Sequence, residues 1–369
     1  MSWPLSQDYN EALQDPGTAF ADAELRRGEV VSNALGLPAP RSGNFADVYQ
    51  VRCPGGAAWA VKCFTREVPG LRERYAHIDA HLRKANLPFS VGFRFLEQGV
   101  RVRGRWYPLL KMQWVEGLTL NEFLRDYRGQ APLLDALAQI WVRMARRLRE
   151  ARVAHGDLQH GNVLLVPGGK PSSLGVRLID YDGMYVPALA DRPSGEVGHP
   201  AYQHPARLRE KAYGPDVDCF PHLVIYTALR ALRAGAPSLW QRYDTGDNLL
   251  FRARDFAEPG ASPLLKELWL SPDEELHHLA GHLVLGCQRE LGRIAWLDAL
   301  VIDGETTPLT QRQQRHVAET LGVAAPAAVT VAAAPPGAAA APDPWADIDA
   351  AAPPPAGKPP RRHREQPAE

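Results

Sequence analysis

Two short segments constrain this chain most, because each places polar side chains directly beside an apolar run. Residues 155–162 read H-G-D-L-Q-H-G-N, which puts Asp157 and Asn162 five residues apart with a glycine between them. Residues 178–183 read L-I-D-Y-D-G, which puts Asp180 directly after two apolar residues. A short loop around a glycine can curl so that both of its polar side chains face one site. Asp157 supplies a carboxylate that can orient a hydroxyl, and Asn162 and Asp180 supply an amide and a second carboxylate, which suit a hard cation such as magnesium.

The residues next to these groups predict a β-hairpin. Residues 163–166 (V-L-L-V) and 176–179 (V-R-L-I) each have the apolar character of a short buried strand. A hairpin made from these two runs would carry Asn162 and Asp180 to the same end of the sheet. Taken singly, Asp157 could simply cap a turn, and Asn162 could occupy a left-handed position. The whole set in this order, with a lysine on an upstream strand, favours a shared site.

In their order along the chain, these motifs resemble those of protein-kinase-like phosphotransferases, specifically bacterial predicted protein kinases with an H-G-D-L-Q-H-G-N loop. The resemblance spans about residues 33–235. Upstream, W-A-V-K ending at Lys62 resembles the kinase V-A-x-K strand, and residues 42–49 occupy the place of the glycine-rich loop. Downstream, residues 198–206 (G-H-P-A-Y-Q-H-P-A) resemble the kinase G-T-P-x-Y-x-A-P-E segment. Asp218 and the apolar run after it resemble the buried aspartate and central helix of the kinase C-terminal lobe.

The resemblance implies an α+β, two-lobed protein-kinase-like fold, with a small β-rich N-lobe and a larger helical C-lobe. Hydrophobic periodicity predicts strands at 48–52, 58–64, 93–97, 99–103 and 107–114, and helices at 16–35, 69–84 and 133–152. The expected organisation is an N-terminal extension at 1–32, the N-lobe at 33–116, the C-lobe at 117–303, a C-terminal helix at 304–322, and a disordered Ala- and Pro-rich tail at 323–369.

The resemblance also implies ATP and Mg²⁺ as cofactors. Lys62 would bind the α- and β-phosphates, while Asn162 and Asp180 would hold the magnesium ion. Asp157 would orient the acceptor hydroxyl and accept its proton. Because residues 198–206 resemble the segment that shapes a peptide-accepting lobe, the expected acceptor is a Ser or Thr hydroxyl of a protein substrate.

Residues 112–117 (M-Q-W-V-E-G) resemble the kinase hinge, in which Met112 would be the gatekeeper. The backbone of Gln113 and Val115 would then contact the adenine ring. The alternative interpretation is an ordinary strand end. Of the usual G-x-G-x-x-G pattern only the middle glycine is present, as Gly43. Side chains at the two outer positions keep the backbone farther from the phosphates, so we expect modest nucleotide affinity.

Three further departures from the family pattern bear on the chemistry. Gly156 stands where many kinases have an arginine that pairs with a phosphorylated activation loop, so activity should not depend on that phosphorylation. Between residues 181 and 206 Ser194 is the one Ser or Thr. Gln159 replaces a lysine that usually faces the γ-phosphate. Asp182 lies between the aromatic residue and the glycine, so the usual D-F-G reads D-Y-D-G.

Two carboxylates of one predicted helix are candidates for the partner of Lys62. The helix predicted at 69–84 contains Glu73, which has the longer reach, and Asp79, which flanks the apolar stripe. Glu73 lies nearly opposite that stripe at about 100° per residue. We expect Glu73 to be the partner because the start of the helix can rotate, and Asp79 is the alternative.

Composition excludes several other classes. Lys plus Arg and Asp plus Glu both number 42, and the zero net charge argues against a nucleic-acid partner. The 4 cysteines form no C-x-x-C pair, which indicates reduced thiols and a cytoplasmic protein. The start M-S-W-P lacks the features of a signal peptide, and the longest apolar run is too short to span a bilayer, so no membrane partner is expected. A metal site at His277, His278 and His282 is less favoured than a cluster of hydrogen-bonded histidines.

The Ala- and Pro-rich tail at 323–369 contains one island, D-P-W-A-D-I-D around Trp345. The alternatives for this island are a docking peptide for a partner protein and a plain linker, of which we favour the linker.

Three functions fit the sequence. The favoured one is a protein kinase that acts on Ser or Thr. The second is a small-molecule phosphotransferase of the aminoglycoside- or choline-kinase kind, since those enzymes also use an H-G-D loop. The third is a pseudokinase that binds a nucleotide or a partner without chemistry. Lys62, Asp157, Asn162 and Asp180 are all present, so nothing in the sequence requires a loss of chemistry, and fold resemblance alone does not identify the substrate.

Overall fold

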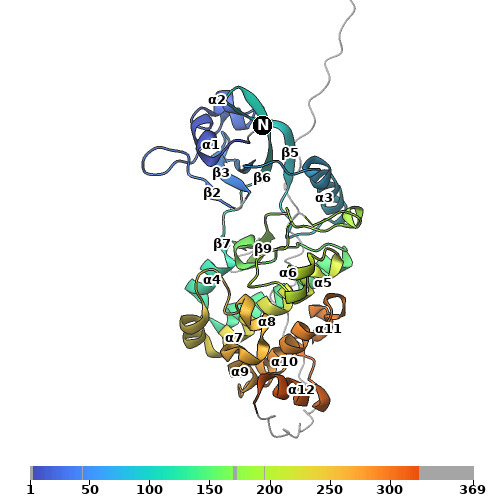
Figure 1. Cartoon of the computed structure of the whole chain (residues 1–369). Coiled ribbons are helices and arrows are strands. Elements are labelled where there is room, and N and C mark those ends of the chain that lie inside the picture. Colours follow the sequence, from blue (N-terminus) through green and yellow to red (C-terminus); the bar gives the residue numbers. More distant parts are fainter. Residues whose placement is uncertain (1–2, 44, 169–172, 195, 324–369) are drawn as a thin grey trace, which may run out of the picture.

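The computed structural model describes residues 3–43, 45–168, 173–194 and 196–323. The chain is α+β, with a sheet-rich N-terminal region and a helical C-terminal region (Figure 1). The tail, including Trp345, lies outside the described residues. No helix among the described residues is long and apolar enough to cross a membrane.

A six-stranded antiparallel sheet forms the N-terminal region, in the order β1-β3-β4-β6-β5 with β2 paired to β3. Its strands are β1 (Glu29–Val30), β2 (Arg41–Ser42), β3 (Ala46–Arg52), β4 (Ala58–Phe64), β5 (Phe93–Val102) and β6 (Arg105–Gln113). The prediction for β4 is confirmed at both ends. The strands predicted at 93–97 and 99–103 are a single strand with an irregularity between Leu96 and Val100.

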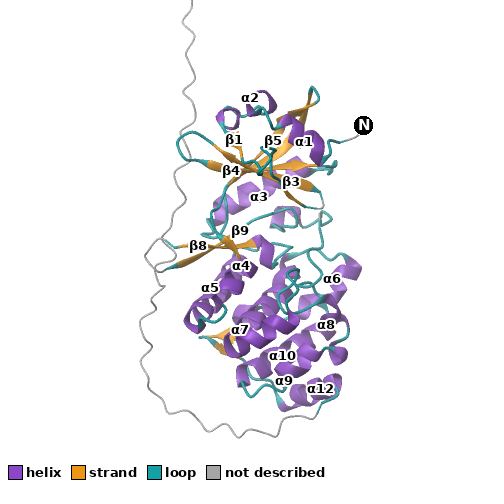
Figure 2. Ribbon diagram, turned by 90° about the vertical axis from the view of Figure 1, so that its left-hand side faces the viewer, coloured by secondary structure: helices purple, strands orange, loops and turns teal. Residues whose placement is uncertain are grey.

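Helices cover both faces of this sheet. Figure 2 shows α1 (Ser6–Ala12) and α2 (Pro16–Ala19) above it and α3 (Leu71–Ala85) below it. Because side chains alternate along a strand, Val61 and Cys63 of β4 pack in the upper cluster with the N-terminal residues, whereas Lys62 points to the other face. This alternation places Lys62 on the side of the sheet that faces α3.

The helix predicted at 16–35 is wrong. Within this range only Pro16–Ala19 and a single 3₁₀ turn at Leu25–Arg27 are helical, and β1 begins at Glu29. The Asp22 carboxylate accepts the backbone N–H groups of Glu24 and Leu25, both at 3.1 Å, and this local capping competes with a continuous helix.

The first 32 residues also do more than precede the sheet. The Lys111 ammonium on β6, only 2% exposed, pairs with Asp22 at 2.9 Å and Glu24 at 2.7 Å. It also lies 4.2 Å from the centre of the Trp59 ring. Tyr9 and Phe20 are buried in the cluster above the sheet. The N-terminal segment is therefore part of the folded sheet region.

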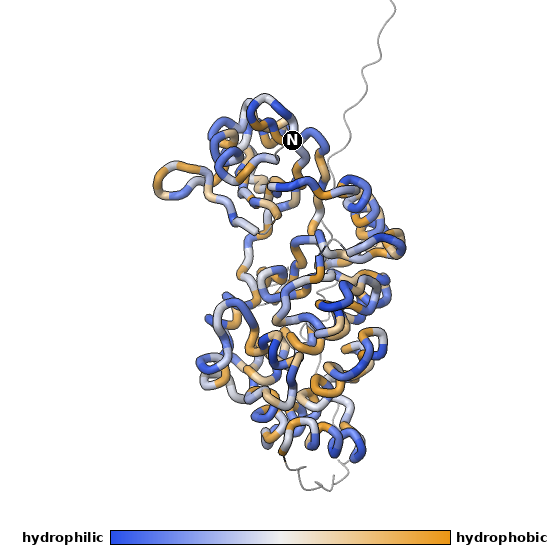
Figure 3. Tube along the Cα trace, viewed as in Figure 1, coloured by the Kyte–Doolittle hydropathy of each residue, from blue (hydrophilic) through white to orange (hydrophobic). Residues whose placement is uncertain are grey.

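One loop stands out from the sheet. Between β1 and β2 the chain projects to the side and is apolar at its tip, where Leu35 is 83% exposed (Figure 3). The Asn33 side chain accepts the N–H groups of Leu35 and Leu37, which orders the loop.

The helical region packs around α7, which contacts both α5 and α10. A three-stranded sheet, β7-β8-β9, lies on the side that faces the large sheet (Figures 1 and 2). The elements are β7 (Leu118–Thr119), α4 (Leu120–Tyr127), α5 (Ala131–Glu150), β8 (Val163–Pro167), β9 (Leu174–Leu178), α6 (Pro205–Glu210), α7 (Cys219–Tyr243), α8 (Ala253–Ala257), α9 (Pro263–Trp269), α10 (Glu274–Gln288), α11 (Leu297–Leu300), β10 (Val301–Ile302), β11 (Glu305–Thr306) and α12 (Gln311–Leu321). The helix predicted at 304–322 is shorter, because β11 takes its first residues.

Candidate active site

The hairpin predicted from the sequence is present and brings two of the polar groups together. Strands β8 and β9 pair antiparallel, with Val163 opposite Leu178. The N–H of Ile179 donates to the backbone oxygen of Asn162 at 3.0 Å, which closes this end of the hairpin. Asn162 and Asp180 therefore lie at the same end of the sheet, as expected.

Lys62 from the large sheet meets the turn that follows β9. Its Nζ lies 2.7 Å from Asp180 Oδ1 and 2.8 Å from Asp182 Oδ2. The Lys62 and Asp182 side chains are 12% and 14% exposed, whereas that of Asp180 is 40% exposed. The cluster thus joins the two regions, and Asp180 is its one partly exposed carboxylate.

The charges of this cluster hold one another in the ionised state. Burial acts to lower the pKa of the Lys62 ammonium, but Asp180 and then Asp182 outweigh it, so that this pKa lies above its usual value. Burial likewise acts to raise the pKa of Asp180, yet the neighbouring Lys62 ammonium holds it below its usual value. Asp180 also has a left-handed backbone, with φ of 65°, which aspartate tolerates better than most residues.

Helix α3 reaches this turn through two residues other than the expected carboxylates. The Tyr75 hydroxyl donates to Asp182 Oδ1. The Arg74 guanidinium donates to the backbone oxygens of Asp182 at 2.9 Å and Met184 at 3.0 Å. Burial and then Asp182 raise the pKa of Tyr75 well above its usual value, so its hydroxyl keeps the proton that it donates.

The structure does not bring Glu73 to Lys62, so that expectation is corrected. Glu73 is exposed and pairs with Arg192 at 2.9 Å, and the alternative, Asp79, pairs with Arg83 at 2.9 Å on its own helix. The physical reason is helical periodicity. The side of α3 that bears Tyr75 is buried against the sheet, and Glu73 lies away from it.

Both oxygens of Asp157 are held by neighbouring donors. Oδ1 accepts the backbone N–H of His199 at 2.7 Å, and Oδ2 accepts Nδ2 of Asn162 at 3.0 Å. Gln159 Nε2 adds a longer contact of 3.3 Å to Oδ2. The Asn162 amide group also donates to the Asp157 backbone oxygen at 3.0 Å. Because its NH₂ group is committed to Asp157, the side-chain oxygen of Asn162 is directed elsewhere and can act as a ligand.

A buried carboxylate fixes the loop that carries Asp157. Asp218, 2% exposed, accepts the backbone N–H groups of His155 and Gly156, the latter at 3.0 Å. The His155 ring lies 2.9 Å from the backbone oxygen of Ile179, next to Asp180. The loop and the turn after β9 are thereby tied together.

Backbone packing explains why a glycine occupies position 156. Gly156 has φ of 81°, and an added Cβ would overlap the backbone oxygen of Gly183 and lie 2.6 Å from its carbonyl carbon. Gly198 has φ of 78°, and an added Cβ would lie 2.9 Å from Asp157 Oδ1. No residue with a side chain fits at position 156 without moving the D-Y-D-G turn.

The remaining predicted nucleotide-binding residues lie on the sheet and at its exit. Met112 is buried at the end of β6, and the N–H of Gln113 donates to Gly92 O at 3.0 Å. Val115 is half-buried in the segment that leads to β7. Gly43 is exposed in the turn between β2 and β3. Contact of these residues with adenine or phosphate stays a prediction.

Sequence reasoning missed three contributors to the site. The sequence predicts Asp182 only as a departure from the family pattern, Tyr75 only as part of the apolar stripe of its helix, and His199 only as part of the 198–206 segment. The D-x-D spacing was the available signal for Asp182, because its two carboxylates flank a single residue. The partners of Tyr75 and His199 come from elements distant in sequence, which local patterns do not reveal.

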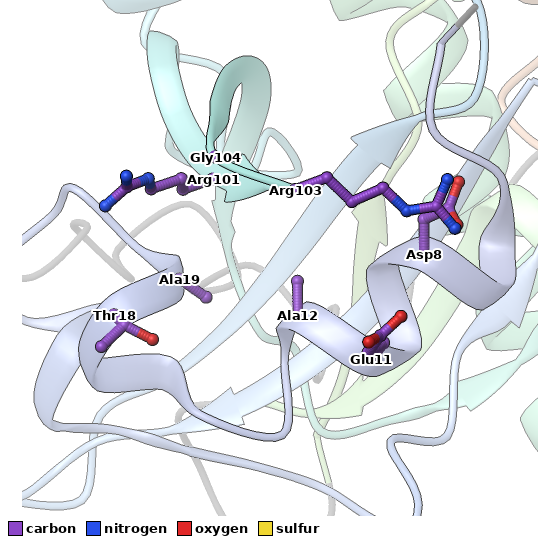
Figure 4. Close-up of a pocket in the computed structure, with 8 residues that line it drawn as sticks. All are labelled: Asp8, Glu11, Ala12, Thr18, Ala19, Arg101, Arg103 and Gly104. Carbon is purple, nitrogen blue, oxygen red and sulfur yellow. The ribbon is translucent and has the colours of Figure 1, made fainter.

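Two other features lie apart from this site. The rings of His277, His278 and His282 each bond to a backbone group, and no cluster of three metal-binding side chains occurs among the described residues. A hollow of about 310 Å³ lies between α1, α2 and the turn that joins β5 to β6 (Figure 4). Asp8 and Arg103 line this hollow and form an ion pair at 2.5 Å. None of the predicted site residues lines the hollow.

No protein-family model matches the sequence, and a search of curated proteins finds no match. The function of this chain is therefore inferred from its residues and their geometry.

Proposed function

We propose that this chain is an ATP- and magnesium-dependent phosphotransferase with a protein-kinase-like, two-lobed fold, and that its acceptor is a Ser or Thr hydroxyl of a protein. The sheet-rich region would be the N-lobe and the helical region the C-lobe. The observation that carries the proposal is the Lys62 ammonium, held between Asp180 and Asp182 where the two regions meet.

This cluster has the chemistry that bound triphosphate requires. A buried lysine whose pKa is raised stays positively charged and can pair with the α- and β-phosphates. The Asp180 carboxylate is the exposed member of the cluster, so a ligand can reach it. Positive charge from one region and negative charge from the other would therefore face the same phosphate chain.

Magnesium fits the oxygen groups at the end of the hairpin. The Asp180 carboxylate and the side-chain oxygen of Asn162 are hard ligands, and Mg²⁺ commonly takes one or two protein ligands and completes its shell with phosphates and water. When bound, magnesium would neutralise phosphate charge as the γ-phosphoryl group departs.

In the proposed reaction Asp157 would act on the acceptor. Its oxygens accept hydrogen bonds from His199 and Asn162 at 2.7 Å and 3.0 Å, and a carboxylate has acceptor capacity beyond these. It can therefore orient an incoming hydroxyl and take its proton. Positioning of this kind provides most of the rate in phosphoryl transfer, because the protein performs little covalent chemistry.

A protein acceptor is favoured because residues 198–206 bind directly to Asp157. The His199 N–H donates to this carboxylate, and Tyr202 of the same segment bonds the His160 ring on the Asp157 loop. A segment that resembles the peptide-binding part of kinases therefore borders the position of the acceptor.

The test is transfer of the labelled γ-phosphate of ATP to three acceptors, namely a generic protein substrate, a panel of small alcohols and aminoglycosides, and buffer alone. Label on Ser or Thr of the protein substrate supports the proposal. Label on a small alcohol alone identifies a small-molecule phosphotransferase. ATP binding without transfer to any acceptor identifies a binding module, and the absence of MgATP binding overturns the proposal altogether.

A further inference from the structure

The Lys62 ammonium has two carboxylate partners, and they differ in what else they can do. Asp180 is 40% exposed and is the proposed magnesium ligand, whereas Asp182 is 14% exposed and faces inward. If Asp180 binds a divalent cation, its negative charge is shared with that cation. Asp182 then remains as the carboxylate that pairs with the Lys62 ammonium. Its low exposure reduces competition from water and strengthens the ion pair.

Asp182 is itself held in place by helix α3. One carboxylate oxygen meets Lys62 at 2.8 Å, and the other accepts the Tyr75 hydroxyl. The backbone oxygen of the same residue accepts Arg74 Nε at 2.9 Å. Arg74 also donates to the Tyr213 hydroxyl at 3.2 Å, which links α3 to the segment that follows α6. Both carboxylate oxygens and the backbone oxygen of Asp182 therefore have partners, which together fix one orientation of this residue.

From this arrangement we propose that Asp182 is the positioning residue for Lys62, with Tyr75 of α3 holding the Asp182 carboxylate in the orientation that grips the lysine. The role of Asp182 in nucleotide binding depends on the proposed function, but its hold on Lys62 does not.

The arrangement has a mechanical consequence. Asp180, the proposed metal ligand, and Asp182, which positions Lys62, lie two residues apart. Both belong to the turn that follows β9. Helix α3 contributes a neutral hydroxyl and an arginine that binds backbone oxygens. Displacement of α3 would thus loosen Asp182 without removing the negative charge next to Lys62. The exposed Glu73–Arg192 pair of the same helix should contribute little.

The first experiment measures the reactivity of Lys62 toward acetic anhydride by mass spectrometry of its peptide, with no nucleotide present. Loss of one nearby negative charge lowers the pKa of a lysine by about 1, and so raises the free-amine fraction about tenfold. Asp182→Asn should therefore raise the labelling rate of Lys62 about tenfold. Tyr75→Phe, which removes only the hydroxyl, should raise it about twofold to threefold. Glu73→Gln is the matched control and should leave it unchanged.

The second experiment measures MgATP affinity by calorimetry. Asp182→Asn should weaken binding about tenfold, the loss expected for one charge-assisted contact. In the Lys62→Met background the same substitution should have less than about a twofold effect, because Asp182 acts through Lys62. A purely structural role would give the same loss in both backgrounds. Circular dichroism melting of each variant identifies any that fails to fold, and Tyr75→Phe then provides the decision.

The outcomes separate the two proposals. If the parent protein does not bind MgATP, the proposed function fails, while the labelling rates still decide whether Asp182 holds Lys62. The inference is overturned if folded Asp182→Asn and Tyr75→Phe leave the labelling of Lys62 unchanged, or if Glu73→Gln raises it as much as Asp182→Asn does.

Discussion

Replacement of Gly156 by alanine tests how closely the two loops of the site are packed. Gly156 lies in the H-G-D loop with φ of 81°, and its nearest neighbour is the backbone of Gly183 in the D-Y-D-G turn. A β-carbon at this position would overlap the Gly183 carbonyl oxygen and lie 2.6 Å from the carbonyl carbon. These neighbours are backbone atoms, so they cannot rotate away as a flexible side chain would.

The cost of the substitution has two parts. A left-handed backbone costs an alanine roughly 1–2 kcal/mol relative to glycine. Forcing an extra carbon into closely packed backbone costs about 1–3 kcal/mol more, through shifts of the surrounding chain. We therefore expect Gly156→Ala to lower the free energy of unfolding by roughly 2–5 kcal/mol, the sum of these two ranges.

Gly104→Ala is the matched control. Gly104 has φ of 80°, almost the same as Gly156, but an added Cβ would meet no described atom within 4 Å. This control carries the backbone cost alone, so urea unfolding of both variants isolates the packing part. The difference should be about 1–3 kcal/mol. Equal losses in the two variants would refute the packing argument.

The same substitution should also affect chemistry. A shift of the H-G-D loop moves Asp157 relative to the turn that carries Asp180. A misplacement of about 1 Å can cost a factor of about 10² in rate. Gly156→Ala should therefore lose phosphoryl transfer even at temperatures where it is fully folded, whereas Gly104→Ala should retain it.

Three further predictions follow from single side chains. Asp157→Ala should reduce turnover by orders of magnitude while calorimetry finds ATP affinity nearly unchanged, and the opposite pattern would remove Asp157 from the acceptor side. Ser194→Ala should match the parent in activity, because position 156 is a glycine and a phosphate on Ser194 would lack the arginine that usually pairs with it. Loss of activity both on phosphatase treatment and in this variant would contradict constitutive activity. Burial, against the opposing pull of Asp218 and Asp298, lowers the pKa of His222 from 6.5 to about 4. Between pH 6.5 and about 4, His222 is protonated in the unfolded chain but neutral in the folded chain. His222 therefore does not lower the free energy of unfolding above pH 6.5, and it lowers it increasingly as the pH falls to about 4. His222→Phe should reduce the loss of unfolding free energy between pH 7 and pH 4 by about 3 kcal/mol, and unchanged acid sensitivity in denaturant titrations would reject this assignment.

Local patterns predicted the parts of this fold whose residues interact with near neighbours. The mostly apolar run at 58–64 predicted β4 with its bounds, and two apolar runs predicted the hairpin that brings Asn162 and Asp180 to the same end of the sheet. The helix predicted at 16–35 failed because Asp22 bonds to its own backbone neighbours and to Lys111 on a distant strand.

The partner of Lys62 shows what local sequence patterns cannot predict about the site. Glu73 was expected from its length and its helix, but a helix contributes to a site through the residues on its inner face, and on α3 those are Arg74 and Tyr75. Which face is inner depends on how the helix packs on the sheet and on the D-Y-D-G turn. Such packing is set by contacts more than 100 residues apart in sequence, as between Tyr75 and Asp182.

Asp180 is the residue on which magnesium-dependent phosphoryl transfer is proposed to depend, and a comparison of Asp180→Asn with the parent tests this role. Asp79→Asn is the matched control, since Asp79 pairs only with the exposed Arg83 in the described structure. With labelled ATP, magnesium and the acceptor that the parent uses, Asp180→Asn should show no transfer above background, while Asp79→Asn should match the parent. Near-parental transfer by a folded Asp180→Asn variant would contradict the account.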